Sequence, residues 1–301
     1  MLERSEKSIE QSIEQSVGQN TGQSIEQRLE KLDDTFTKSE RRIAVYLREN
    51  PDAVQYMSIT TLSEKCGVSE ATISRFCRKL GLDGYNDLKI TLAQRNASPA
   101  FSGKVHLGPS LTSGEIIEMC AAVDADALTA TARALDPDAI DRAVGLIERA
   151  QNVYCFGQGG SSLLAQDICS RFMTFHRGFR AGGDSHTQLL QAANMTENDV
   201  ILFVSYSGAT RDMVETLETA RKRKVRVILI THCGDSTGAS YADAVLLCGQ
   251  KESLLESGSI PVKISILFVA DVLVLRYLSR HREESEEAQK RATMALNTKY
   301  I

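Results

Sequence analysis

The stretch ITTLSEKCGVSEATISRFCR, residues 59–78, determines the architecture of the first part of this 301-residue chain. Its apolar residues recur at the spacing of two short helices, and Gly67 lies between them, where the turn needs a flexible backbone. Ser63 supplies the small side chain that two crossing helices need where they approach each other. The pattern predicts a helix-turn-helix motif. Its apolar positions are Leu62, Cys66, Val68, Ile73 and Phe76.

The second helix of this motif has the features of a helix that enters the major groove of DNA. Ser69 is placed to cap its amino terminus, and Glu70 adds negative charge near the positive end of the helix dipole. The outward-facing residues are small, polar or basic, which suits contacts to phosphates and base edges. An ordinary amphipathic hairpin is the alternative. The predicted site for double-stranded DNA comprises Ser69, Glu70, Thr72, Ser74, Arg75, Arg78 and Lys79.

Composition and charge limit the remaining possibilities. The net charge of −4 argues against an indiscriminate polyanion binder, and residues 28–95 carry only 12 Lys and Arg against 10 Asp and Glu. This small basic excess favours DNA binding by two copies on a dimer-spaced site. The seven scattered cysteines lack a CxxC pair, which predicts reduced, mostly buried thiols and no metal site. Without a long apolar run or a signal-peptide core, the chain is expected to be cytoplasmic and not to enter a membrane.

The chain divides into segments with different patterns. Residues 8–27 read SIEQ, SIEQ, SVGQ, NTGQ, SIEQ, and this four-residue period with its glycines predicts a mobile tail over 1–27. A short helical arm that packs in a dimer is the alternative. A helical domain is expected over 28–104, with a Ser-, Gly- and Pro-rich stretch at 96–110. The further segments expected are a linker and connecting helix (105–136), an α/β domain (137–283) and a terminal helix or tail (284–301).

The second part of the chain alternates short apolar runs with helical stretches. The segments between the runs are long enough for right-handed crossover connections, which predicts an α/β fold with a parallel sheet covered on both faces. In such sheets a ligand binds beyond the carboxyl ends of the strands. The four runs are NVYCFG (152–157), VILFVS (200–205), VRVILIT (225–231) and AVLLC (244–248).

Two of these strand ends are rich in glycine and small hydroxyl residues. GQGGSS at 157–162 and SYSGAT at 205–210 each lead directly into a helix. Glycines let a ligand approach the backbone, helix amino termini bind anions, and hydroxyls complete a phosphate cradle. Neither turn has a P-loop lysine, and Ser162 replaces the third glycine of the dinucleotide motif, so no nucleotide cofactor is expected. Either turn alone is consistent with an empty connection, but two turns in one sheet favour a phosphate site.

The order of these motifs resembles the RpiR family of bacterial transcription regulators, whose carboxyl-terminal half is a sugar isomerase (SIS) domain. The resemblance runs from about residue 28 and rests on SEATISRFCRKLGLDGY, GxGxS and DVILFVSYSGAT. It implies a flavodoxin-like αβα domain with five parallel strands that binds a phosphorylated sugar. His186 is also consistent with an ordinary capping or surface residue. The implied ligand residues are Gly157, Gly159, Ser161, Ser162, His186, Ser205, Ser207, Gly208 and Thr210.

One stretch departs from the family pattern. The family often has an Arg-Ser-Gly segment before its last long helix, whereas this chain reads LESGSIPVK at 255–263. Glu256 therefore stands in place of a basic residue, and the ligand is expected to differ in charge or contacts. The following helix, expected over 262–280, is apolar on most faces. It is buried either between two subunits or in the core of one.

Together these features predict a regulator whose affinity for a pseudo-palindromic operator is controlled by a phosphorylated sugar. It is expected to form a homodimer or homotetramer and to use no metal or cofactor. The alternative is an enzyme, a sugar-phosphate isomerase with an appended helical module, for which only His186 and Glu256 are candidate general bases. A third interpretation is a DNA-binding domain whose sheet serves only as a dimerisation scaffold.

Overall fold

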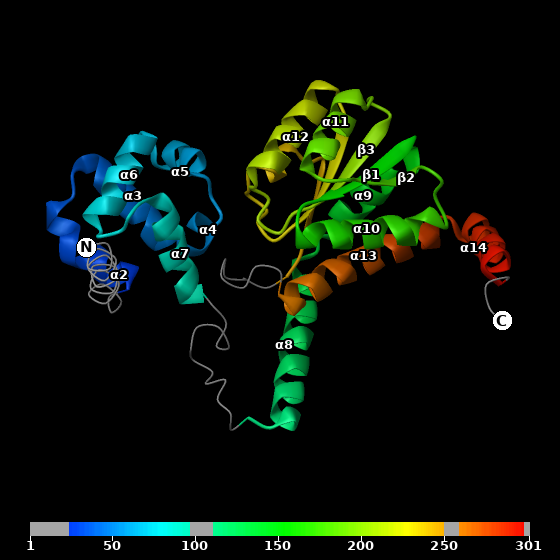
Figure 1. Cartoon of the computed structure of the whole chain (residues 1–301), viewed down its shortest axis with the longest axis horizontal. Helices are drawn as coiled ribbons and strands as arrows, with labels where there is room; N and C mark the ends of the chain where they lie inside the picture. The colour runs from blue at the N-terminus through cyan, green and yellow to red at the C-terminus, as the bar shows by residue number, and fades with distance from the viewer. Residues whose placement is uncertain (1–23, 97–110, 250–258, 298–301) are drawn as a thin grey trace, which may run out of the picture. The chain divides into compact units, whose positions relative to one another are not determined.

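The computed structural model describes residues 24–96, 111–249 and 259–297. The chain divides after Asn96 into two compact units with separate hydrophobic cores. The first unit is helical and the second is an α/β domain with a parallel sheet (Figure 1), so the predicted fold class is confirmed. Within the described ranges, no helix combines the length and the apolar character needed to cross a membrane.

The helical unit follows the capping signals of its sequence. Thr37 accepts a hydrogen bond from the N–H of Glu40, whose carboxylate accepts one from the N–H of Thr37, and this capping box begins α3. Pro51 occupies the first turn of α4, where a missing N–H costs nothing. The elements are α2 (Ile25–Leu32), η1 (Asp33–Thr35), α3 (Lys38–Glu49), α4 (Pro51–Val54), α5 (Ile59–Cys66), α6 (Glu70–Lys79) and α7 (Tyr85–Asn96).

The first described helix begins earlier than predicted. Ser24 caps α2 by accepting the N–H of Gln27, whose side chain accepts the N–H of Ser24 in return. Ile25 is only 4% exposed and belongs to the core of the unit. The predicted tail is therefore wrong for residues 24–27, because the last SIEQ repeat is a capping box that starts a helix. The rest of the predicted tail and the stretch 97–110 lie outside the described residues.

The turn between α5 and α6 has the geometry that the sequence predicts. Gly67 ends α5 in the left-handed region, with φ +60° and ψ 44°, where a residue with a Cβ is strained. The N–H of Val68 donates to the carbonyl of Ser63, and the hydroxyl of Ser63 donates to the carbonyl of Val68. Ser63 thus closes the turn as well as allowing the two helices to approach.

The second unit contains the four predicted strands, each within two residues of its expected bounds, and one short edge strand. Its elements are α8 (Ser113–Ala134), α9 (Pro137–Arg149), β1 (Asn152–Gly157), α10 (Gly160–Met173), β2 (Phe179–Ala181), α11 (Ser185–Asn194), β3 (Asp199–Val204), α12 (Arg211–Lys222), β4 (Arg226–Thr231), η2 (Ala239–Tyr241), β5 (Ala244–Leu247), α13 (Ile260–Arg280) and α14 (Arg282–Asn297).

The sheet has the strand order β2-β1-β3-β4-β5, and all pairs are parallel. Cys155 of β1 pairs with Leu202 of β3, and Phe203 of β3 pairs with Leu229 of β4. From β1 the chain continues to β2 at one edge of the sheet, and from β3 it continues to β4 and β5 toward the opposite edge. The carboxyl ends of β1 and β3 therefore form the topological switch point at which doubly wound sheets bind ligands.

Helices cover both faces of this sheet (Figure 1). Side chains of α9, α10 and α13 form one core with the sheet, and side chains of α11 and α12 form the other. α13 buries one face within its own subunit, including Ile266, Val269 and Leu273, while Leu275 is 64% exposed. For the buried face, the interpretation as a core helix of one subunit is therefore correct.

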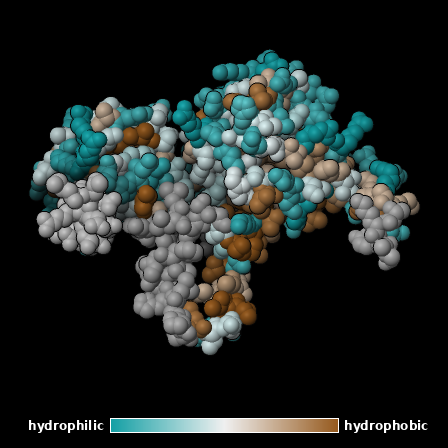
Figure 2. All heavy atoms as spheres, viewed as in Figure 1, coloured by the Kyte–Doolittle hydropathy of each residue, from teal (hydrophilic) through white to brown (hydrophobic). Residues whose placement is uncertain are grey.

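α8 is buried only near its carboxyl end. Ala127 and Thr131 are buried where α8 packs against α13, but Ile116 is exposed and Ile117 is 68% exposed. Figure 2 shows apolar side chains gathered along this helix. All seven cysteines are free, and Cys120 on α8 is the one that is fully exposed, so the prediction of mostly buried thiols is confirmed.

Candidate functional site

Three helices begin at the carboxyl edge of the sheet. α10 follows β1, α11 follows β2 and α12 follows β3, so their amino termini lie at the switch point. Asp184 caps α11 by accepting the N–H of Thr187. Among the described residues, α10 and α12 have no side-chain cap. Their first N–H groups therefore remain available to an anion.

The first glycine turn is shaped by steric limits. A Cβ on Gly157 would lie 2.6 Å from the carbonyl oxygen of Ser161, so the strand end has no space for a side chain. Gly159 takes φ +53° at the start of α10, and the hydroxyl of Ser162 donates to its carbonyl at 2.7 Å. This folds the strand back into the helix within a few residues. The side chain of Ser161 remains half-buried at the helix start.

The second turn holds two hydroxyls in fixed positions. The Oγ of Ser205 accepts the N–H of Gly208 at 3.2 Å, and the Oγ of Ser207 accepts the N–H of Ala209 at 3.4 Å. Each oxygen uses a lone pair in this way, so its O–H remains a donor for an anion. Gly208 has φ +60°, and a Cβ there would lie 2.1 Å from the Oγ of Ser236. Glycine is therefore required at this turn.

A side-chain hydrogen bond joins the two turns. The Oγ1 of Thr210 donates to the Oε1 of Gln158 at 3.0 Å, although the two residues are 52 positions apart. Thr210 occupies the position that would cap α12, and its hydroxyl is directed to the other turn instead. The result is one cradle of hydroxyls and two uncapped helix ends, which suits a phosphate group.

α11 is tied to this cradle by Gln188. Its side chain is 1% exposed and donates to the carbonyls of Gly157, at 2.8 Å, and Gly183, at 2.7 Å. His186 lies in the same first turn of α11 with an exposed side chain. The structure thus places His186 on an element beside the cradle. Glu256, the other candidate general base, lies outside the described residues.

Gln158 and Gln188 were not among the predicted ligand residues. The Nε2 of Gln158 and the Oε1 of Gln188 are buried without a hydrogen-bond partner in the described structure. Buried polar atoms are usually satisfied, so both atoms are candidates for contact with a bound ligand. Gln158 lies within a turn that the sequence analysis singled out, whereas no local pattern distinguishes Gln188 from other helical polar residues.

On the helical unit, α6 presents the predicted outer face. The hydroxyl of Ser69 accepts the N–H of Thr72 at 3.2 Å and so caps the helix as expected. Arg75 and Arg78 are exposed, and neither forms an ion pair with a described residue. Nη2 of Arg75 lies 3.5 Å from the Oγ1 of Thr72, and Ser74 is half-buried.

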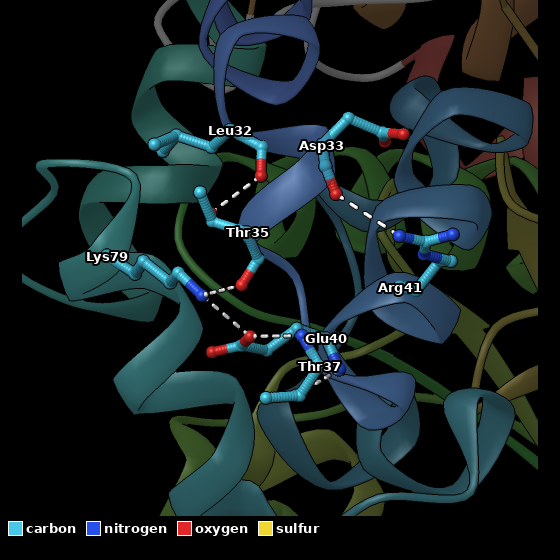
Figure 3. Close-up of polar contacts among 7 residues, drawn as sticks. All are labelled: Leu32, Asp33, Thr35, Thr37, Glu40, Arg41 and Lys79. Atoms are coloured by element: carbon cyan, nitrogen blue, oxygen red, sulfur yellow. Dashed lines mark hydrogen bonds and ion pairs between the residues drawn. The ribbon is translucent and has the colours of Figure 1, made fainter.

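Two predicted DNA contacts are already engaged within the domain. The ammonium of Lys79 donates to the carbonyl of Thr35 at 2.7 Å and pairs with Glu40 at 2.8 Å (Figure 3). It therefore attaches the end of α6 to the start of α3. The carboxylate of Glu70 accepts the hydroxyl of Thr60 at 2.6 Å. Both groups hold the motif together.

We expect Glu40→Gln to destabilise the chain at neutral pH by about 0.5–1 kcal/mol, because it removes one charge of a partly buried pair. Burial raises the pKa of Glu40, but hydrogen bonds from Lys79 and Thr37 outweigh it and lower the pKa below 4.5. The charged form therefore adds stability above that pH, and the gain is lost as pH falls through the lowered pKa. Urea unfolding at a series of pH values should show the full difference at pH 7 and a decreasing one as pH falls below the ordinary carboxyl range. An equal difference across the series would contradict this assignment.

The comparisons with known proteins agree with this arrangement. Residues 2–99 match the helix-turn-helix domain of the rpiR family, and residues 146–276 match the SIS domain. The chain is 30% identical over 275 residues to the HTH-type transcriptional regulator HexR of Escherichia coli, covering 89% of this chain and 93% of that protein. It is 34% identical over 219 residues to HexR of Pseudomonas aeruginosa, with coverages of 71% and 74%.

A solved structure is similar over most of the chain. The NanR protein of Vibrio vulnificus, complexed with ManNAc-6P, is 28% identical to this chain with a TM-score of 0.73. The match covers 90% of this chain and 97% of that protein.

Proposed function

Because the chain belongs to the RpiR family of helix-turn-helix transcriptional regulators with a SIS domain, we propose that it binds operator DNA under the control of a phosphorylated sugar. The observation that carries this proposal is the hydrogen bond between Thr210 and Gln158, which joins two glycine turns and two uncapped helix ends into one cradle. Such a cradle suits an anion, because free helix N–H groups and hydroxyls are donors to it.

The phosphate is proposed to lie against the hydroxyls of Ser161, Ser205, Ser207 and Thr210 and the first N–H groups of α10 and α12. The NanR structure supports a phosphorylated sugar as the ligand, since that protein is complexed with ManNAc-6P. The sugar would extend toward α11, which carries His186 and the buried Oε1 of Gln188 that has no hydrogen-bond partner in the described structure.

The same cradle argues for binding rather than catalysis. Its described side chains are hydroxyls and neutral amides, and none of these is a general base for removing a proton from carbon. His186 is exposed, whereas an efficient base is held in place beside the reacting carbon. We therefore favour the regulator over the isomerase, although both use the same fold.

On DNA, the proposed contacts come from the outer face of α6. Arg75 and Arg78 lie one helical turn apart and carry charge that no described acidic residue neutralises. Thr72, Ser74 and Ser69 supply shorter donors around them. Because one motif has few basic groups, two copies are proposed to act on one operator.

The second copy is proposed to cover apolar surface of the SIS domain. Ile116, Ile117 and Val123 are all exposed on α8, and a grouped exposed apolar surface is typical of an interface between proteins. Sedimentation equilibrium at micromolar concentration should therefore give a mass of at least a dimer. The monomer mass, with or without operator, would overturn this part of the proposal.

The proposal is tested with a panel of hexose, pentose and amino-sugar phosphates. A true effector should raise the melting temperature in proportion to its binding free energy and should also change operator affinity in a gel-shift titration. The unphosphorylated sugars are the matched control and should do neither. Turnover of any panel member between aldose and ketose would favour the isomerase instead.

A further inference from the structure

A hollow lies at the amino-terminal end of β1, whereas the cradle lies at its carboxyl end. It has a volume of about 720 Å³ and is lined by the end of α10, the loop before β2, the first residues of β1 and the helix α14. Figure 1 shows α14 beyond the β2 side of the sheet, after the end of α13. This size falls within the range of small-molecule sites, roughly 300–1,000 Å³. We call it the basic hollow.

Three arginines line the basic hollow, namely Arg177, Arg180 and Arg291, and its described lining contains no Asp or Glu. Arg177 forms no ion pair with a described residue. Arg291 lies 3.7 Å from Glu287 one turn earlier on α14, where an exposed pair contributes little. Arg180 donates through one nitrogen to two carbonyl groups, those of Arg177 and Phe179, at 2.8 and 2.9 Å.

This grouping needs a physical reason, because guanidinium groups repel one another and the chain as a whole has net charge −4. Cations near the carboxyl end of α10 complement its dipole, which accounts for Arg177 and Arg180. It does not account for Arg291, which comes from α14 more than a hundred residues later in the chain. A bound anion accounts for all three, since guanidinium pairs bidentately with carboxylate and phosphate.

His176 also lines the basic hollow. Its Nδ1 accepts the N–H of Gly178 at 3.1 Å, so in the neutral ring the proton is on Nε2, which then donates. Burial lowers the pKa of His176, and the charges of Arg177 and Arg180 lower it further, which favours the neutral ring. A bound anion would reverse this effect and raise the pKa.

We propose that the basic hollow binds a small organic anion with two or more negative charges, carried as phosphate or carboxylate groups. The apolar side chains of Met173 and Phe175 in its lining suit the carbon skeleton of such a ligand. Arg177 and Arg180 lie in and before β2, and Arg291 lies on α14. An anion bound to all three therefore links α14 to the sheet. Within its described residues, α14 is buried only at Ser285 and Ala288, so this junction stabilises its position.

The test uses the full chain and two probes, pyrophosphate and citrate, in calorimetric titrations at low salt. Arg177 and Arg291 are exposed, so R177A/R291A should fold normally and should bind at least one probe at least tenfold more weakly at this site. The Arg282→Ala variant is the matched control, because Arg282 is an exposed arginine of α14 outside the hollow that pairs with Glu286. A phosphate ligand predicts tighter binding of pyrophosphate, and a polycarboxylate ligand predicts tighter binding of citrate.

Two further measurements keep the basic hollow separate from the cradle. The S205A/S207A variant should retain probe binding at the hollow, so failure of either site is visible independently. In the unsubstituted chain, the preferred probe should slow hydrogen exchange in α14 and raise the pKa of His176 measured by NMR, and R177A/R291A should show neither effect. The proposal is overturned if R177A/R291A binds both probes as tightly as the parent, or if R282A weakens probe binding to the same extent. It is also overturned if the only effect of R177A/R291A is weaker sequence-independent binding to DNA, with probe binding unchanged.

Discussion

Replacing Arg75 and Arg78 together with alanine should reduce affinity for the operator by about thirtyfold or more. Both side chains are exposed on α6 and pair with no described acidic residue, so their guanidinium groups are available to DNA. Alanine at both positions removes these contacts. A base-reading arginine contributes about 1–3 kcal/mol, and the pair therefore about 2–6 kcal/mol. Fluorescence anisotropy against operator and scrambled duplexes at two salt concentrations measures the effect.

The two arginines are distinguished by their single variants. Loss of a base contact relaxes sequence preference, whereas loss of a phosphate contact weakens all sequences alike and flattens the salt dependence. The Arg48→Ala variant is the control, because it removes the same charge from α3, where the guanidinium pairs with Asp33. Parent-like operator binding by R75A/R78A would remove α6 from the DNA interface.

Replacing Ser205 and Ser207 together with alanine should abolish the effector response and leave basal DNA binding intact. Each hydroxyl is held by a backbone N–H and offers its own proton to the phosphate, and each hydrogen bond to a charged group contributes about 1.5–3 kcal/mol. The turn should survive, because the N–H of Gly208 also donates to the carbonyl of Ser205. Calorimetry with the effector found in the panel measures the loss.

A matched double variant tests whether the loss is specific. Ser170→Ala combined with Ser240→Ala removes two exposed hydroxyls of the same domain, on α10 and η2, and should leave effector binding unchanged. If S205A/S207A bound the effector as tightly as the parent, the phosphate would have to lie elsewhere.

Most of the fold could be predicted because its helices and strands have local sequence patterns. The four longer strands are continuous apolar runs because each is buried on both faces, and such runs are visible without knowing their neighbours. β2 was missed from the residues alone because it has three residues, FRA, and two of them are exposed. The start of α2 was missed although its capping box is local, because the repeat around it suggested a tail.

In the candidate sites, too, local features could be predicted and contacts between distant elements could not. The glycine turns were visible because left-handed and crowded positions require glycine, and the structure shows both conditions at Gly208. Helical periodicity predicts that Lys79 lies on the DNA face, because it gives the direction of a side chain from its own helix axis. The partners of Lys79 within the domain, Thr35 and Glu40, belong to other elements, so no local pattern shows them.

The helix-turn-helix, the parallel α/β fold and the two hydroxyl-rich turns can be predicted from the amino-acid sequence, because each depends on periodicity or backbone preference within a short window. Only the folded domain brings Thr210 to Gln158, sets Gln188 against the first turn and places Arg291 in the same hollow as Arg177. Those contacts depend on strand order and on the packing of distant helices. No local pattern records them, because the residues meet only after the whole domain has folded.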